Sequence, residues 1–116
     1  MNTTALDLTQ NPPRSGREML GGYAWLARLA DKVRAEQAGT QGDYVAYCPL
    51  SIGFLQRTGV GRNAFDALIA QGSSDEELVR YFDRHVSGEQ RDEANEYVLE
   101  ERRLNLDEQD AEEGRP

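Results

Sequence analysis

The sequence predicts a mainly α fold, namely a compact bundle of four to five helices with an extended N-terminal arm and at most one short strand. Apolar residues recur three and four positions apart in several windows, which is the period of an amphipathic helix. Glycines separate these windows, as expected of short loops between helices. Only residues 44–47 are rich in side chains that favour a strand. The length of 116 residues suits a single domain.

The first 14 residues are expected to form an extended arm. Pro12 and Pro13 lack amide donors and push the residues before them out of the helical conformation. Leu6 and Leu8 alternate with polar residues, and this spacing suits a short strand or a segment that lies across a groove.

The helical domain is expected to span residues 15–106. Ser15 and Glu18 match the capping-box pattern and predict a helix start. The strongest helix is predicted over residues 22–38, because one stripe of it is apolar and Gly39 can end it. Further helices are predicted over residues 49–58, 62–71, 74–86 and 89–104, the last with only a thin apolar stripe.

Charge is distributed unevenly along the chain. The 13 basic and 21 acidic residues give a net charge of −8, which makes nucleic-acid binding unlikely, because affinity for phosphate backbones depends mainly on Lys and Arg. Residues 107–116 contain five acidic residues and one basic residue, and no apolar residue larger than alanine. We therefore predict that they form a disordered acidic tail.

Composition excludes several other classes of protein. The apolar runs are too short for a transmembrane helix or a secretory signal, so we expect a cytoplasmic protein without a membrane association. The single cysteine excludes an internal disulfide framework. With one cysteine and one histidine, a structural zinc site is not expected, and no other metal or cofactor is predicted.

Two local features have a chemical interpretation and a structural one. The segment GVGRNAF, residues 59–65, is similar to the glycine hairpin of some DNA-binding proteins, but its surroundings are acidic, which favours a joint between two helices. Cys48 could act as a nucleophile only with a base nearby, and His85 is the only histidine. We therefore interpret Cys48 as a small buried residue and His85 as a partly buried side chain, and predict no catalytic residue.

A row of charged residues lies on the strongest predicted helix. Arg28, Asp31 and Lys32 share one helical face, and Arg34 follows within the same turn. Such a row could bind a carboxylate or phosphate, could be a solvated face with weak ion pairs, or could hold the N-terminal arm in a buried network. The candidate ligand-binding residues are Arg14, Arg17, Arg28, Asp31, Lys32, Arg34, Tyr44 and Tyr47.

These segments also resemble a known family. The strings PPRSGREMLGGYAWLARLADKVRA and GDYVAYCPLS, with a later Gly-x-Ser-Asp-Glu-Glu at residues 72–77, are similar to the bacterial domain of unknown function 5069. The resemblance covers about residues 6–86, and it departs from the pattern at Gly16, where proline is expected. It implies a bacterial helical domain and assigns no reaction, substrate or cofactor.

Two functions follow as hypotheses. The first is a non-enzymatic protein-interaction or self-associating domain, because the polar last helix and the arm would suit a protein partner or a homodimer. The alternative is a small-molecule or anion-binding domain, with or without enzymatic activity, that uses Arg28, Asp31, Lys32 and Arg34.

Overall fold

The fold is mainly α, as predicted. The computed structural model describes residues 5–115 and, within them, contains no sheet; a single isolated bridge joins Leu20 and Tyr23. None of its helices is long and apolar enough to cross a membrane, within those same residues. The helices are α1 (Leu26–Ala38), α2 (Pro49–Thr58), α3 (Arg62–Ala70), α4 (Asp75–His85), α5 (Gly88–Glu96), the π-helical turn η1 (Tyr97–Glu101) and α6 (Arg103–Glu112).

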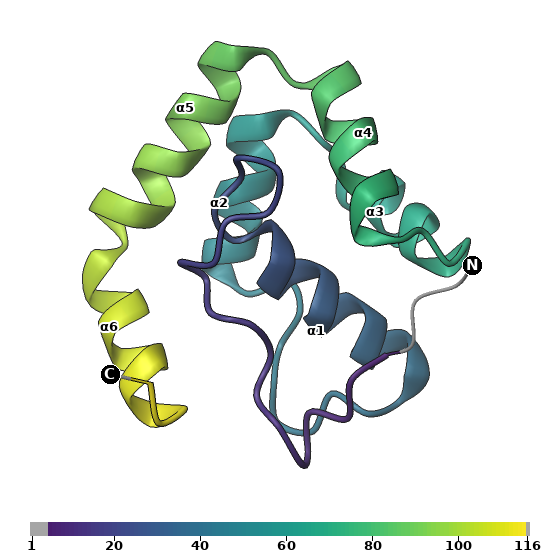
Figure 1. Cartoon of the computed structure of the whole chain (residues 1–116), viewed down its shortest axis with the longest axis vertical. Helices are drawn as coiled ribbons and strands as arrows, with labels where there is room; N and C mark the ends of the chain where they lie inside the picture. The colour runs from purple at the N-terminus through teal and green to yellow at the C-terminus, as the bar shows by residue number, and fades with distance from the viewer. Residues whose placement is uncertain (1–4, 116) are drawn as a thin grey trace.

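Helix α1 occupies the middle of the molecule. The arm crosses it, α3 and α4 lie to one side, and the arc of α5, η1 and α6 runs along the other (Figure 1). Because neighbours surround it, every residue from position 26 to position 35 is buried, including the charged ones. The charged row is therefore not a solvated face, whereas Glu36 and Gln37 at the end of the helix are exposed.

Helix α1 begins later than the sequence predicted. The capping-box residues Ser15 and Glu18 form a tight turn instead of a helix, with the Glu18 amide donating to the Ser15 carbonyl at 3.0 Å. Gly21 and Gly22 then adopt φ values of 59° and 88°, and Trp25 also has a positive φ of 74°. Successive left-handed residues cannot belong to a right-handed helix, so α1 starts immediately after Trp25.

Helices α2, α3 and α4 match their predicted positions to within a residue at either end. Their signals are local: Pro49 occupies the first turn of α2, and Gly59 ends that helix with a φ of 76°. Ser74 caps α4, and its hydroxyl and the Glu77 side chain form the reciprocal capping box. Val60 is buried between α2 and α3, in agreement with the joint predicted there.

Helix α2 packs directly against the arc of α5, η1 and α6, because Gly53 has no side chain and lets Tyr97 approach the α2 backbone closely. A side chain at this position would overlap the phenol of Tyr97, which lies in η1. Tyr97, Val98 and Leu106 are buried, so the polar last helix is held down within the monomer.

The disordered tail predicted for residues 107–116 is contradicted. Residues up to Glu112 are helical in α6, and the Leu106 and Asp110 side chains are buried. The acidic composition suggested disorder because the partners of these carboxylates are distant in sequence. Arg17 donates to Asp110 at 3.0 Å and Arg28 donates to Glu113 at 2.7 Å, and these contacts neutralise the tail and hold it in place.

The arm is extended only in part. Residues 8–10 form a turn, and the Leu8 amide donates to the Thr40 carbonyl at 2.8 Å, which places the buried Leu8 beside the end of α1. Residues 1–4 of the predicted arm lie outside the described residues.

Candidate functional site

The candidate site is built around the charged row of α1. Arg28, Asp31, Lys32 and Arg34 are only 2%, 4%, 4% and 7% exposed. A buried charge is costly unless a partner of opposite charge and hydrogen bonds compensate it. The partners of each charged residue therefore show whether that residue stabilises the fold or is available to bind a ligand.

Asp31 and Arg34 belong to a structural network. Arg14 on the arm donates to both oxygens of Asp31, at 2.9 and 3.0 Å, and also to Asp75 at 2.9 Å. Arg34 donates to Asp75 at 2.9 Å from the other side. Burial alone would raise the pKa of Asp75, but these two guanidinium groups hold it below its usual range. The network joins the arm, α1 and the start of α4, and its groups satisfy one another.

Arg28 is paired with the C-terminal end of the chain. It donates to the two oxygens of Glu113 at 2.9 and 2.7 Å, a bidentate geometry in which both side chains are buried. Tyr44 donates to the same carboxylate at 3.0 Å, and Arg115 contacts it as well. Burial would raise the pKa of Glu113, yet Arg28 and these neighbours lower it. The residues after α6 thus form a clasp over α1.

Lys32 differs from the other three charged residues of α1. Within residues 5–115, no carboxylate lies within ion-pair distance of its ammonium group. Its Nζ lies 3.6 Å from the Sγ of Cys48 and 5.2 Å from the centre of the Trp25 ring. Burial lowers the pKa of Lys32, an effect opposed by the charge of Cys48. The chain therefore buries this lysine with a thiol as its nearest partner and with Glu113 only as a more distant charge.

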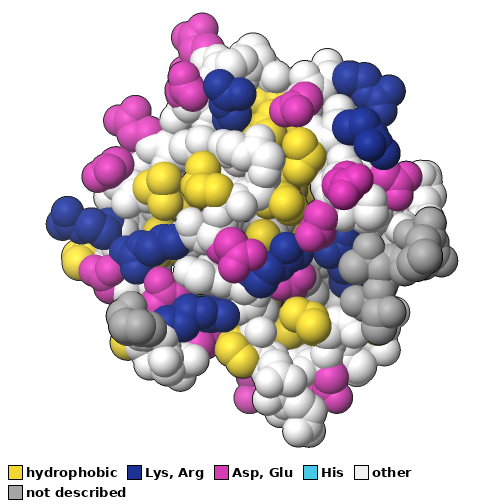
Figure 2. Space-filling model, in the orientation of Figure 1, with side chains coloured by type: hydrophobic (Ala, Val, Ile, Leu, Met, Phe, Trp, Pro, Cys, Tyr) yellow, Lys and Arg dark blue, Asp and Glu magenta, His cyan; other side chains and the backbone are white. Residues whose placement is uncertain are grey.

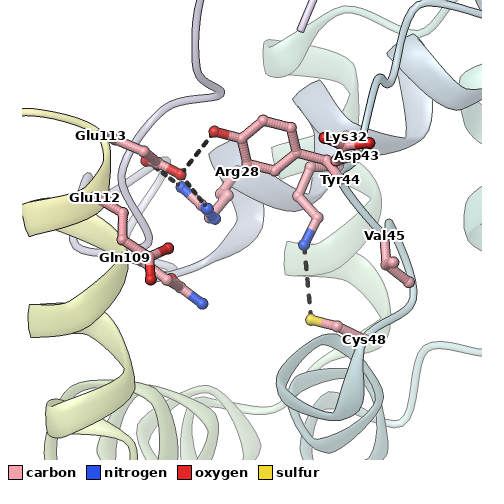
Figure 3. Close-up of a pocket in the computed structure, with 9 residues that line it drawn as sticks. All are labelled: Arg28, Lys32, Asp43, Tyr44, Val45, Cys48, Gln109, Glu112 and Glu113. Atoms are coloured by element: carbon pink, nitrogen blue, oxygen red, sulfur yellow. Dashed lines mark hydrogen bonds and ion pairs between the residues drawn. The ribbon is translucent and has the colours of Figure 1, made fainter. Parts of the chain in front are cut away.

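Lys32 and Arg28 line a pocket. It lies between α1, the loop at residues 43–48 and α6, and its volume is about 500 Å³, which is within the range of small-molecule sites (Figure 3). Two buried atoms of its lining residues have no hydrogen-bond partner among the described residues, Nε of Arg28 and Oε1 of Gln109. Both atoms are enclosed by the protein, so a ligand would reach them only after a neighbouring side chain moves. The side chains that matter for its chemistry are Arg28, Lys32, Tyr44, Cys48, Gln109 and Glu112.

Cys48 gives the pocket a chemically active group. It is half-buried and occupies the N-cap of α2, followed by Pro49 in the first turn. Burial alone would raise the pKa of the thiol, but the Lys32 ammonium and the polar groups at the start of α2 together outweigh it, so the pKa is lowered. The thiol was interpreted from the sequence as a small buried residue, whereas the structure places it beside a cation at the wall of a pocket.

The remaining candidates point elsewhere. Arg17 binds Asp107 and Asp110 and holds α6. Tyr47 donates to Asp66 on α3 and does not line the pocket. Of the eight candidate residues, the structure brings Arg28, Lys32 and Tyr44 into the pocket, and places Arg14, Asp31 and Arg34 in the network described above.

Two more predictions concern chemistry outside the pocket. His85 is exposed, stacked on Tyr81 at 4.1 Å, and is not partly buried as predicted; it lies at the end of α4, where the core no longer covers it.

Among residues 5–115, no cluster of three or more His, Cys, Asp or Glu side chains could hold a metal ion. On the face shown in Figure 2, acidic and basic side chains are interspersed, without a continuous basic surface.

The pocket residues contributed by α6 were missed by the sequence analysis because they belong to the segment predicted to be disordered. The Cys48 site had a signal in the sequence, a cysteine directly before a proline at a predicted helix start, because thiols at helix N-termini are often activated.

Comparison with known proteins supports including this segment in the domain. A search of the curated proteins found no match to the chain. The family model described as "Domain of unknown function (DUF5069)" matches residues 10–115, which include every helix and all the pocket residues named above. This match extends the resemblance seen in residues 6–86 through the whole C-terminal arc. The chain therefore belongs to the DUF5069 family.

Proposed function

We propose that this domain binds a small anionic molecule in the pocket between α1, the 43–48 loop and α6. The observation that carries the proposal is Lys32, a lysine that is 4% exposed and lacks a carboxylate partner within residues 5–115. Burying a cation is unfavourable for folding unless an anion compensates it. The Cys48 thiol at 3.6 Å offsets this cost only when it is ionised, and a ligand anion would offset the remainder, because binding sites are selected for affinity and not for stability.

The lining of the pocket narrows the class of ligand. Lys32 offers positive charge, Arg28 is already paired with Glu113, and Asp43 and Glu112 add negative charge elsewhere on the wall. A polyanion would be repelled by these carboxylates. A small molecule with one carboxylate and with amide or ammonium donors, such as an amino acid or a short peptide, matches both kinds of group.

A protein-interaction or self-associating role stays a prediction, as does a cytoplasmic location. The main reason for that role was the thin apolar stripe of the last helix, which seemed to need a partner. In the structure Tyr97, 7% exposed, and Val98, fully buried, pack inside the monomer, although Leu104 at the end of the stripe is 72% exposed, so we favour the ligand-binding function.

The test is thermal stabilisation of the protein by small carboxylates, amino acids, short peptides and inorganic phosphate, followed by calorimetric titration of any compound that stabilises it. We expect at least one carboxylate-bearing compound to bind, and Lys32→Met to abolish its binding while leaving the thermal midpoint unchanged or higher. Arg80→Met is the matched control, because it removes one positive charge from an exposed position of α4. The proposal is wrong if no compound stabilises the protein, or if a bound compound retains its affinity in Lys32→Met.

A further inference from the structure

We propose that Cys48 is a thiol–disulfide exchange site, which forms a mixed disulfide with a small disulfide that carries carboxylate groups. The inference rests on the proposed function, because the same pocket holds the carboxylate. It adds a reaction and a substrate class to that binding site.

The local geometry is that of an activated thiol. Cys48 is the N-cap of the ten-residue helix α2, with an extended φ of −71° and ψ of 169°. The backbone N–H groups at a helix start point towards its N-cap, and the helix dipole favours a negative charge there. Lys32 adds a full positive charge at 3.6 Å from the sulfur. A thiolate is the nucleophile in disulfide exchange, so this placement favours the reactive form.

Ser51 lies three residues after Cys48, but its hydroxyl proton is not donated to the thiol. Its hydroxyl donates to the Ala46 carbonyl at 2.7 Å and accepts a hydrogen bond from Trp25 at 3.0 Å. The hydroxyl has one proton, so its 3.4 Å contact with Cys48 cannot also be a donated hydrogen bond. Activation of the thiol is therefore assigned to Lys32 and the start of α2, and Ser51 holds Trp25 and the 43–48 loop in place.

Two residues that line the same pocket each have one enclosed polar atom without a partner, which a side-chain shift would bring to the rest of the substrate. Nε of Arg28, a residue only 2% exposed, has no hydrogen-bond partner within residues 5–115, and neither does the buried Oε1 of Gln109. Nε donates a hydrogen bond and suits a carboxylate oxygen, whereas Oε1 accepts one and suits an amide or ammonium donor. A low-molecular-weight peptide disulfide carries both groups beside its sulfur atoms.

The proposed reaction balances without an additional oxidant. The Cys48 thiolate attacks one sulfur of the small disulfide, a new S–S bond forms, and the other half leaves as a thiolate. No proton has to move in this step. The chain contains one cysteine, so the mixed disulfide cannot be resolved internally. A second small thiolate must attack the bound sulfur, which regenerates the Cys48 thiolate and releases a disulfide.

The first experiment measures the rate at which the full chain acquires one adduct, by intact-protein mass spectrometry, with glutathione disulfide as the probe. We expect the folded protein to react about tenfold faster at neutral pH than the same chain unfolded in urea, because a larger fraction of the thiol is ionised. We also expect glutathione disulfide to react faster than the uncharged hydroxyethyl disulfide, and that in turn faster than the cationic cystamine. A folded rate equal to or below the unfolded rate, or the reverse order of the three disulfides, would overturn the inference.

Variants separate activation of the thiol from binding of the ligand. Lys32→Met should slow the reaction and move the midpoint of its pH–rate profile upward. The control Arg80→Met should leave the rate and the midpoint unchanged. An unchanged midpoint in Lys32→Met would contradict the role of Lys32. Binding of S-methylglutathione, which cannot exchange, to Cys48→Ala tests the proposed function alone. Binding without any enhanced exchange in the parent protein refutes the exchange site only. Enhanced exchange in the parent without binding and without a preference for the anionic disulfide refutes both the carboxylate site and the substrate class.

Discussion

Replacement of Glu113 by alanine should destabilise the protein more than any other single change in the C-terminal clasp. The variant leaves the guanidinium of Arg28, which is 2% exposed, without its bidentate carboxylate. Removal of one partner of a buried ion pair costs about 3–5 kcal/mol. Arg28→Met should cost less, because Glu113 keeps its contacts with Tyr44 and Arg115. The double variant should be less destabilised than the sum of the two single variants, because no buried charge is left unpaired.

Equilibrium unfolding in urea, followed by the fluorescence of Trp25, measures these differences. Trp25 is the only tryptophan and is fully buried at the start of α1, so its emission reports directly on the helix to which Arg28 belongs. For a small domain the free energy of unfolding falls by about 1–3 kcal/mol per molar urea. A loss of about 3 kcal/mol therefore lowers the midpoint by at least about 1 M urea.

Two results would refute this reasoning. A loss below about 1 kcal/mol in Glu113→Ala is the value of a solvent-screened pair and would mean that the clasp is open in solution. Strict additivity in the double variant would mean that Arg28 and Glu113 do not interact.

Two further predictions concern the same segment. Truncation after Leu106 removes the carboxylates that bind Arg17 and Arg28, namely Asp107, Asp110 and Glu113. The thermal midpoint should therefore fall by several degrees. An unchanged midpoint would mean that residues 107–116 are disordered after all. The pKa of Glu113 is lower in the folded protein than its usual 4.5, so the unfolded chain binds more protons near that pH. The stability that Glu113 contributes is therefore present above about pH 4.5 and is lost as the pH falls through the folded pKa. Urea midpoints measured across this range should show a smaller loss of stability in Glu113→Gln than in the parent protein.

The parts of the fold that the sequence predicted have local signals. The start of α4 depends on Ser74 and Glu77, and the end of α2 depends on Gly59, all within a few residues of the boundary they define. Capping and apolar spacing therefore suffice to locate these helices. At Ser15 and Glu18 the same capping pattern failed, because the glycines and the left-handed Trp25 that follow direct the chain into a bridge and turn.

The C-terminal arc was mispredicted because its stability depends on contacts far apart in the sequence. Glu113 is 85 positions from Arg28 and Asp110 is 93 positions from Arg17, and no local pattern connects them. Composition treats the acidic residues of α6 as mutually repelling charges. In the folded chain each of these two carboxylates has an arginine partner, so the repulsion that would favour disorder is largely removed.

The candidate site could be predicted from the sequence only in part, for a related reason. Arg28, Asp31, Lys32 and Arg34 are equivalent in the sequence, since each is a charged residue on the same helix. They differ only in what other segments bring to them: a carboxylate from α4 or from the residues after α6 for the arginines, and a thiol for Lys32. Replacement of Lys32 by methionine should leave the stability unchanged or raise it, because the burial of this cation is costly to the fold. Its burial at the wall of a pocket, beside a thiol and not a carboxylate, is the observation that a bound anion would explain.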